Sequence, residues 1–487
     1  MRKNLISKIS IFLSSIIYIL FFYFLNKNNI LPTKVRFMIL ALVLVLIVGF
    51  SYLVFRKKVT SIPTKIIYIV LLLLISIAEG LFISYANTSI KTVEKINQKK
   101  DIDKTEMSFV VLKETPIQSI NDIEETQVAI AGQMDDKNTN QTLEKYKKEN
   151  NKDLNVEDLG DYLKAGNALI NGNIQVMLLN ESFREMLDES IEGFSDKTRV
   201  LKSFSVNGDK KLKENNGVEK DQSFNVYISG IDTYGSLSTV SRSDVNLIVS
   251  VNPKERKILI TTIPRDTYVN LVGLGDDAYD KLTHAGLYGV DTSIKTLENF
   301  LDIDIDYYAK VNFTTLTKLI DLLGGVEVEN PVKFRATSGK YSFPQGKIHM
   351  DGDMALTFSR ERYNLEEGDF DRGKNQVRVM TGIINKLLSK ETLLNFNSIA
   401  DVALDSVNTN LPYNKMIEMV NCQIEEDKDW TINSQAIKGY TQEGLQSYLM
   451  PGYNLYMMQA DENSIKEVHD NILENNKSKC NKDDLSI

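Results

Sequence analysis

The chain has 487 residues, which is too long for one small core and predicts two or more globular units. Only two cysteines and three histidines are present, which argues against a disulfide scaffold, a cysteine-rich zinc site and a histidine-dependent catalytic triad. The net charge of −8 is uneven, because residues 1–90 hold ten Lys or Arg and one acid, so that the remainder carries −8 − 9 = −17. An acidic body of this kind argues against general nucleic-acid binding.

Three apolar runs open the chain, Ile6–Leu25, Phe37–Phe55 and Ile66–Ala86. Each is close to the ~20 residues that cross a bilayer as a helix. The first run lacks a small-residue cleavage site and two more spans follow it, so we do not interpret it as a signal peptide. The N-terminus and the second loop together hold seven Lys or Arg and the first loop holds three, which predicts a cytoplasmic N-terminus. We therefore expect a multi-pass protein of the cell membrane whose body, after residue 87, is extracellular.

A charged segment, residues 91–104, lacks apolar periodicity and predicts a linker. Residues 105–215 then alternate between strand-like stretches, such as SFVVLK and TQVAIAG, and helix-like stretches, such as Gln141–Asn150. This alternation predicts a small α/β accessory domain, in which we find no convincing catalytic group. Residues 208–222 are rich in Lys, Asn and Gly, which is typical of a second linker.

The largest expected domain, residues 222–487, opens with three strand-like segments: FNVYISGID, VNLIVSVN and KILITTIPRDTYV. Charged residues stand at the ends of these strands, where α/β sheets place ligand sites. Those residues are Asp232, Arg242, Asp244, Arg265 and Asp266. Taken alone, each Asp is more often a turn or cap residue. Together, separated aspartates without nearby His or Cys suit a hard cation such as Mg²⁺, and adjacent arginines suit a phosphate.

Arginine is concentrated further along the same domain. The chain has 13 arginines, of which 8 lie between Arg242 and Arg378 and none follows. Within the segment Ser359–Met380, the polar residues of interest are Arg360, Arg362, Asp369, Arg372, Gln376 and Arg378. The alternative interpretation is a solvated helix face with alternating charges. We expect the first two arginines to point the same way from an extended segment, Arg372 and Gln376 to share one helix face, and Arg378 to lie on another face.

Six motifs carry a family resemblance, and their order and spacing make it specific. They are GIDTYG…RSD (230–244), VNPKERKI…TIPRDTYV (251–269), DKLTHAGLYG (280–289), LLGGVEV (322–328), GKIHMDGDMALTFSRER (346–362) and DFDRGKNQ (369–376). On these motifs the chain resembles the LytR-CpsA-Psr (LCP) family over about residues 222–390. The three spans and the accessory domain resemble streptococcal capsule-locus members of that family. The chain departs from the family pattern at Thr283, where many members have Asn, and at Asn375, where many have Arg.

The resemblance implies a mixed α/β extracellular LCP domain with a central sheet flanked by helices. It implies a phosphotransferase that moves a capsular or other cell-wall glycopolymer from an undecaprenyl-pyrophosphate carrier onto peptidoglycan of a Gram-positive bacterium. By motif, Asp232 and Asp244 hold Mg²⁺ or Mn²⁺, and Asp369 and Arg372 lie at the transferring phosphate, with Asp369 as the candidate base. The residues implied to grip the pyrophosphate are Arg242, Arg265, Lys281, Arg360, Arg362 and Gln376. The prenyl chain is implied to lie in an apolar groove.

Two other functions are alternatives to the ligase. In the first, the domain is a regulator that binds the polyprenyl pyrophosphate and reports to capsule-assembly proteins. In the second, it is a lipid pyrophosphatase that transfers the phosphoryl group to water with the same residues. Turnover of a lipid-pyrophosphate substrate separates the enzyme from the regulator, and product analysis separates the ligase from the hydrolase. A DNA-binding regulator is the least consistent with three spans and an acidic body, so we expect no nucleic-acid partner.

Overall fold

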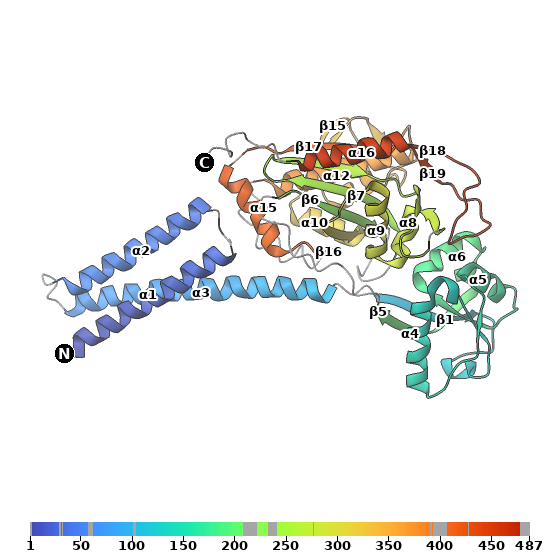
Figure 1. Ribbon diagram of the computed structural model, residues 1–487, viewed down its shortest axis with the longest axis horizontal. Helices are drawn as coiled ribbons and strands as arrows, with labels where there is room; N and C mark the ends of the chain where they lie inside the picture. The colour runs from blue at the N-terminus through green and yellow to red at the C-terminus, as the bar shows by residue number, and fades with distance from the viewer. Residues whose placement is uncertain are drawn as a thin grey trace. The chain divides into compact units, whose positions relative to one another are not determined.

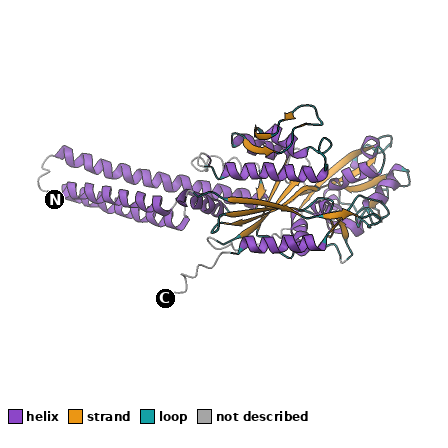
Figure 2. Ribbon diagram, turned by 90° about the horizontal axis from the view of Figure 1, so that it is seen from above, coloured by secondary structure: helices purple, strands orange, loops and turns teal. Residues whose placement is uncertain are grey.

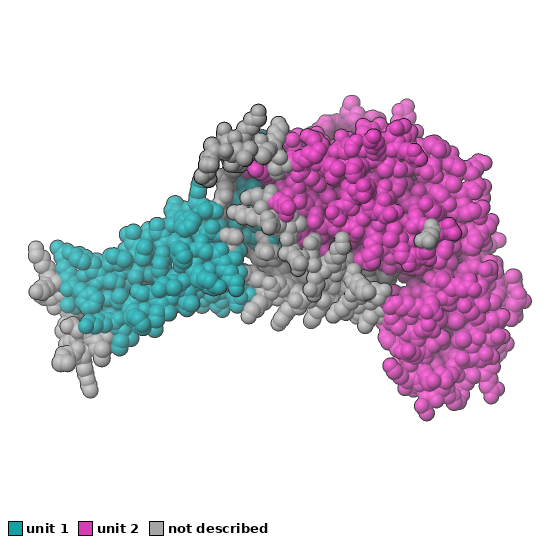
Figure 3. Space-filling model, viewed as in Figure 1, with its two compact units in different colours: residues 1–98, 387–404, 411–429 teal, residues 99–386, 405–410, 430–487 magenta. Residues whose placement is uncertain are grey.

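The computed structural model describes residues 2–28, 31, 33–56, 62–100, 104–207, 222–231, 241–275, 277–389, 392, 407–426 and 428–477. The chain forms two compact units (Figure 3). One unit comprises residues 1–98, 387–404 and 411–429, and the other comprises residues 99–386, 405–410 and 430–487. The first unit therefore holds the apolar helices together with α15 (Tyr413–Glu426), and the second holds the accessory and main domains.

The three expected spans are confirmed as helices long and apolar enough to cross a membrane. They are α1 (Arg2–Asn28), α2 (Thr33–Phe55) and α3 (Ile62–Lys100), with apolar spans Ser7–Asn28, Thr33–Phe55 and Pro63–Asn87. Helices α1 and α3 touch where the Ser76 hydroxyl donates to the Ser14 hydroxyl at 2.9 Å. Helix α3 continues through Lys100, so most of the segment that we expected to be a linker is helical.

The accessory domain is a five-stranded α/β unit, as its alternating pattern predicts. Its strands are β1 (Lys104–Leu112), β2 (Val128–Ile130), β3 (Val156–Asp158), β4 (Val176–Asn180) and β5 (Thr198–Asn207), in the order β3-β2-β4-β1-β5. Its helices are η1 (Ile120–Ile123), α4 (Gly132–Asn150), α5 (Tyr162–Ile170), η2 (Glu181–Phe183), α6 (Arg184–Ser190) and α7 (Phe194–Lys197). Strands β2, β3 and β4 are parallel, and β1 runs antiparallel between β4 and β5. Nearly all of the second expected linker, residues 208–221, lies outside the described residues.

The main domain is built on a six-stranded mixed sheet (Figure 1). In sheet order the strands are β16 (Asn408–Thr409), β11 (Tyr307–Asn312), β6 (Phe224–Ile231), β7 (Ser243–Asn252), β8 (Lys257–Thr262) and β17 (Thr431–Ala436). The third expected strand is shorter than its apolar run, because it ends at Thr262, just before Pro264, which has no N–H for the ladder. The chain then turns away to form β9 (Tyr268–Asn270), which pairs with β10 (Tyr279–Lys281).

Smaller strand pairs and helices complete the domain. The pairs are β12 (Val326–Asn330) with β15 (Gly346–Met350), β13 (Phe334–Arg335) with β14 (Ser342–Phe343), and β18 (Gly439–Thr441) with β19 (Met458–Ala460). The helices are α8 (Leu282–Ala285), η3 (Gly286–Tyr288), α9 (Val290–Leu301), α10 (Phe313–Leu322), α11 (Gly352–Arg360), α12 (Asp369–Leu387) and α16 (Glu462–Asn476).

Both faces of the large sheet are apolar, and both are covered by helices (Figure 2). Tyr227 on β6 lies opposite Ile248 on β7, and both pack into the core that contains α9 and α16. The next pair along the strands, Ile228 opposite Leu247, points to the other face, toward α10, α11 and α12. Because successive strand residues alternate between faces, an uninterrupted apolar run supplies both sides of the sheet.

The arginine segment differs from our expectation in one respect. Arg360 is the last residue of α11 and the following Glu361 is extended, with φ −64° and ψ 136°, so Arg360 and Arg362 do not share one extended segment. Helix α12 begins at Asp369, so Arg372 and Gln376 lie one turn apart on it, as their spacing predicts.

The close contact between α10 and α11 generates a stability prediction. A Cβ added at Gly352 would lie 2.3 Å from the Thr317 carbonyl oxygen of α10, which leaves no room for a methyl group. We expect Gly352→Ala to lower the free energy of unfolding by about 1–3 kcal/mol through overpacking. In Gly373→Ala, the control, the new methyl group would lie 3.6 Å from Thr262 Cγ2, an ordinary contact, so we expect little change. Thermal unfolding of the full-length protein in detergent compares the two; equal melting temperatures would contradict the contact.

Candidate active site

A cavity of about 390 Å³ lies between the sheet and the helices α10, α11 and α12; we call it the α10–α12 cavity. Its wall is apolar, and the wall residues are Ile228, Val245, Leu247, Val311, Phe313, Leu316, Leu356, Val379, Met380 and Ile383. Five arginines and Gln376 line the same cavity. The arginines are Arg242, Arg265, Arg360, Arg362 and Arg372. The structure therefore brings together residues that are 130 positions apart in the sequence, at a cavity that is apolar on one side and cationic on the other.

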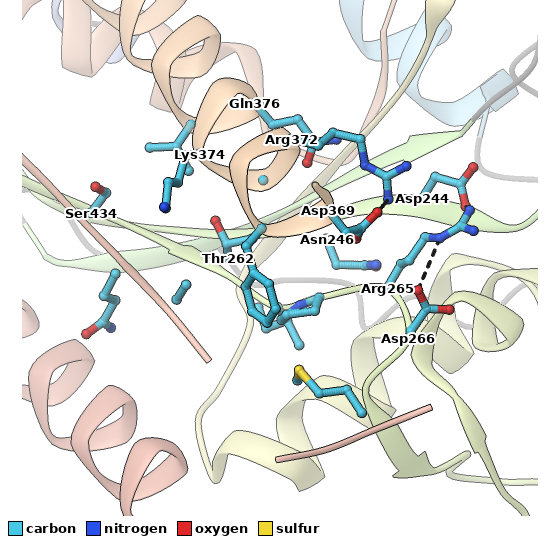
Figure 4. A pocket seen from close by; sticks show the side chains of 18 of the residues that line it. Asp244, Asn246, Thr262, Arg265, Asp266, Asp369, Arg372, Lys374, Gln376 and Ser434 are labelled. Atoms are coloured by element: carbon cyan, nitrogen blue, oxygen red, sulfur yellow. Dashed lines mark hydrogen bonds and ion pairs between the residues drawn. The ribbon is translucent and has the colours of Figure 1, made fainter. Parts of the chain in front are cut away.

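Arg265 is compensated by two carboxylates at the end of β8. Its Nη1 donates to Asp244 Oδ1 at 2.8 Å, and its Nε lies 3.6 Å from Asp266 Oδ2 (Figure 4). Burial alone would lower the pKa of the Arg265 guanidinium, but Asp244 and Asp266 outweigh it and raise the pKa above its ordinary value. Thr283 supports the arrangement, because its hydroxyl donates to Asp244 Oδ1 at 3.2 Å. Thr283, which stands where many family members have Asn, thus gives Asp244 a second hydrogen-bond donor beside Arg265.

The positive charge of Arg372 is balanced less fully by nearby carboxylates than that of Arg265. Its Nη2 lies 2.7 Å from Asp369 Oδ1, three residues earlier on α12, and Figure 4 shows the two side chains pointing toward each other. Burial lowers the pKa of the Arg372 guanidinium, Asp369 opposes this only in part, and the charge of nearby Arg265 adds to it, so the pKa lies below its ordinary value. A cation in this position is stabilised further by any anion that enters the cavity.

The remaining arginines of the cavity have aromatic or acidic neighbours. The Arg360 guanidinium carbon lies 4.2 Å from the centroid of the Phe313 ring, a cation–π distance. The corresponding distance from Arg362 to the Tyr363 ring is 5.0 Å, and Arg362 Nη1 lies 3.9 Å from Asp369 Oδ1.

Arg242 is held by the accessory domain, which the sequence did not predict. Its Nη2 lies 2.7 Å from Glu185 Oε1 and 3.0 Å from Glu189 Oε1, and its Nη1 donates to Glu189 Oε2 at 3.1 Å. Burial would lower the pKa of the Arg242 guanidinium, but the two carboxylates raise it above its ordinary value. Both glutamates lie on α6 and line the α10–α12 cavity. Their i,i+4 spacing puts them on one helix face, but no local signal indicates that this face meets the main domain.

Three further residues that the sequence analysis considered, Lys281, Asp232 and Arg378, are not among the described residues that line the α10–α12 cavity. Lys281 lines neither this cavity nor its neighbour described below, and its Nζ donates to Asp266 Oδ1 at 2.8 Å. Its contact with the pyrophosphate stays a prediction. Asp232 lies outside the described residues. Arg378, which we expected away from the site, donates from Nη1 to Asn375 Oδ1 at 2.6 Å and lines the neighbouring cavity.

The described residues contain no cluster of three or more His, Cys, Asp or Glu side chains arranged to hold a metal ion. Asp244 nevertheless lines both cavities, and the hydrogen bonds and ion pair given above engage its Oδ1 atom. Because Mg²⁺ typically takes one or two protein carboxylates and completes its shell with water and phosphate, a single carboxylate beside an anion site is a compatible donor set.

Comparison with known proteins identifies the family. The LytR_cpsA_psr family model matches residues 191–473, more than half of the chain and more than the motifs alone cover. A polyisoprenyl-teichoic acid–peptidoglycan teichoic acid transferase, TagU of Bacillus cereus, is 32% identical over 291 residues, which is 59% of this chain and 90% of the relative. TagU of Bacillus anthracis is 36% identical over 222 residues, covering 45% of this chain and 70% of the relative. The chain belongs to the LytR_cpsA_psr family.

Two solved structures and a second family model also match parts of the chain. The crystal structure of B. subtilis TagV is 27% identical, covers 53% of this chain and 98% of that chain, and has a TM-score of 0.46. B. subtilis TagT with bound octaprenyl pyrophosphate lipid is 29% identical, covers 54% and 95%, and has a TM-score of 0.41. A second family model, described as DNA polymerase processivity factor, matches residues 56–179. That match spans about a quarter of the chain and includes the whole of helix α3, with its apolar span, so we assign no function from it.

The glutamates of α6 compete with any anion for Arg242, and this generates a prediction. We expect the double variant Glu185→Gln/Glu189→Gln to bind inorganic pyrophosphate roughly tenfold more tightly. The reason is that pyrophosphate then no longer has to displace the two carboxylates from the Arg242 guanidinium. Calorimetric titration of the full-length protein in detergent measures the change. Glu149→Gln is the control, because its partner is Lys202, outside the cavity. Weaker binding by the double variant would instead mean that the glutamates hold Arg242 in its binding position.

Proposed function

We propose that this chain is a membrane-anchored, Mg²⁺-dependent phosphotransferase. It takes a capsular or other cell-wall glycopolymer from an undecaprenyl-pyrophosphate carrier and attaches it to peptidoglycan through a phosphodiester. One observation carries this proposal: the α10–α12 cavity combines five arginines with an apolar wall. A ligand with a multiply charged head and a long apolar chain satisfies both parts. The names of the relatives, which describe a transferase acting between a polyisoprenyl-linked polymer and peptidoglycan, support the same class of reaction.

The proposed reaction is an in-line phosphoryl transfer. A hydroxyl of peptidoglycan attacks the phosphorus nearest the polymer; a new P–O bond forms to that hydroxyl oxygen, the bond to the bridging oxygen breaks, and undecaprenyl phosphate leaves with the bridging oxygen. The hydroxyl proton passes to Asp369, which Arg372 holds at 2.7 Å. Arg372 and Arg265 neutralise the charge on the phosphate oxygens. Such catalysis depends on positioning and electrostatics more than on covalent help from the protein.

Asp244 is the described residue that would hold Mg²⁺ or Mn²⁺, with Asp232 as the second ligand that the family motif implies. The ion supplies further neutralisation of the pyrophosphate charge when it is bound. Arg242, Arg360, Arg362 and Gln376 are proposed to bind the pyrophosphate or the adjoining groups, since all four line the cavity.

Loss of Arg372 tests the proposal. We expect Arg372→Ala to reduce transfer of a lipid-linked glycopolymer to purified peptidoglycan by about 10²–10³-fold, the usual effect of removing one charge stabiliser. The matched control is Arg335→Ala, an exposed arginine on β13 that lines neither cavity and should leave the rate unchanged. The assay uses the full-length protein in detergent.

The products of the same assay separate the competing functions. A phosphodiester between polymer and peptidoglycan supports the ligase. A glycopolymer that ends in a free phosphate would identify a hydrolase, and binding of the lipid without turnover would identify a regulator, so either result would overturn the proposal.

The membrane orientation has its own test. We propose that the N-terminus is cytoplasmic and that the two soluble domains are extracellular, because the basic residues flanking the three apolar helices favour this orientation. An epitope appended to the C-terminus should therefore be reached by antibody on intact protoplasts, whereas one at the N-terminus should be reached only after permeabilisation. The opposite labelling pattern would contradict the extracellular assignment.

A further inference from the structure

A second cavity, of about 330 Å³, is also lined by Arg372; we call it the β17 cavity. It is bounded by the first half of α12, the end of β8 and the strand β17 (Figure 4). Four residues line both cavities: Asp244, Arg265, Arg372 and Gln376. The two cavities therefore meet at the residues that we propose to surround the transferring phosphate.

The lining of the β17 cavity is chemically different from the apolar wall of the α10–α12 cavity. It contains the polar side chains of Ser434, Asn246 and Thr262, and Thr262 is only 9% exposed, with a hydroxyl that makes no hydrogen bond to the described residues. It also contains two aromatic rings, Phe370 and Tyr456, which are 45% and 55% exposed. Apolar ring faces beside polar side chains, one of them the unpartnered Thr262 hydroxyl, match a saccharide, which presents both hydroxyls and an apolar ring face.

The direction of the reaction favours an acceptor in this cavity. In an in-line displacement the attacking oxygen and the leaving oxygen lie on opposite sides of phosphorus. If the leaving prenyl phosphate occupies the α10–α12 cavity, the attacking hydroxyl must approach from another side of Arg372 and Arg265. The β17 cavity provides such an approach, since it opens onto the same two arginines.

The position of the proposed base agrees with this assignment. Within the described part of the chain, Asp369 lines the β17 cavity and does not line the α10–α12 cavity. Its carboxylate is 39% exposed and is paired with Arg372. A base that takes a proton from the acceptor hydroxyl must lie within hydrogen-bond reach of that hydroxyl, on the acceptor side of the phosphate.

We propose that the β17 cavity binds the acceptor glycan of peptidoglycan, with Phe370 and Tyr456 against the sugar rings and Ser434 and Thr262 as hydrogen-bonding partners. This inference rests on the proposed transferase function, because it names the acceptor side of the same site. The sugar next to the donor pyrophosphate offers the same chemistry, so the test must separate the two saccharides.

The test uses the double variant Phe370→Ala/Tyr456→Ala of the full-length protein in detergent. Tyr440→Ala is the matched control, because Tyr440 is a 60% exposed tyrosine on β18 that lines neither cavity. Steady-state transfer is measured first with varied soluble peptidoglycan glycan and then with varied lipid-linked donor. We expect the KM for the acceptor to rise roughly tenfold through the loss of two aromatic contacts, with the KM for the donor unchanged.

An unchanged acceptor KM would overturn the proposal, and so would a rise confined to the donor KM, which would assign the cavity to the donor sugar. A second measurement does not depend on turnover: binding of a lipid-free peptidoglycan oligosaccharide should be detectable with the wild-type protein and the control, and lost in the double variant. If that binding holds but no transfer occurs, the transferase function fails while the glycan site stands. If the wild-type protein binds no glycan, the glycan site fails even where transfer is observed.

Discussion

The site depends on carboxylates that neutralise the positive charges of closely spaced arginines at one edge of the large sheet. Asp244 lies 2.8 Å from Arg265, and Asp369 lies 2.7 Å from Arg372. Without these partners, several half-buried guanidinium groups would repel one another and pay the full cost of leaving water. Because Arg372 keeps a pKa below its ordinary value, the compensation is incomplete at one point. That point lies where the two cavities meet.

Much of this arrangement could be predicted from local patterns. Alternation of apolar residues identified β6 and β7, and the strand ends correctly located Asp244 and Arg265 beside each other. Helical spacing correctly put Arg372 and Gln376 on one face of α12. The errors arose where non-local packing decides the conformation. Arg360, for example, is the last residue of α11, which packs against α10, and nothing within two residues of Arg360 indicates that contact.

The accessory domain is the part whose role was least predictable. Its fold follows from alternating strands and helices, yet its contribution to the site comes from two glutamates on a seven-residue helix. Their side chains are 64% and 54% exposed, whereas that of Arg242 is 13% exposed. The glutamates can thus return to water at little cost, while the buried arginine needs a partner in every state. Lys281, another cation that the family motif implies, is paired with Asp266 and lines neither of the two cavities.

We propose that one cavity holds both parts of a polyprenyl pyrophosphate, the phosphates at the arginines and the chain along the wall of α10, α11 and α12. An experimental structure of the full-length protein with a bound polyprenyl pyrophosphate and Mg²⁺ is the decisive measurement. We expect density for the two phosphates beside Arg265 and Arg372, and for the prenyl chain between Leu247 and Leu316. Density for the lipid at another surface, or a phosphate site with the apolar cavity left empty, would contradict it.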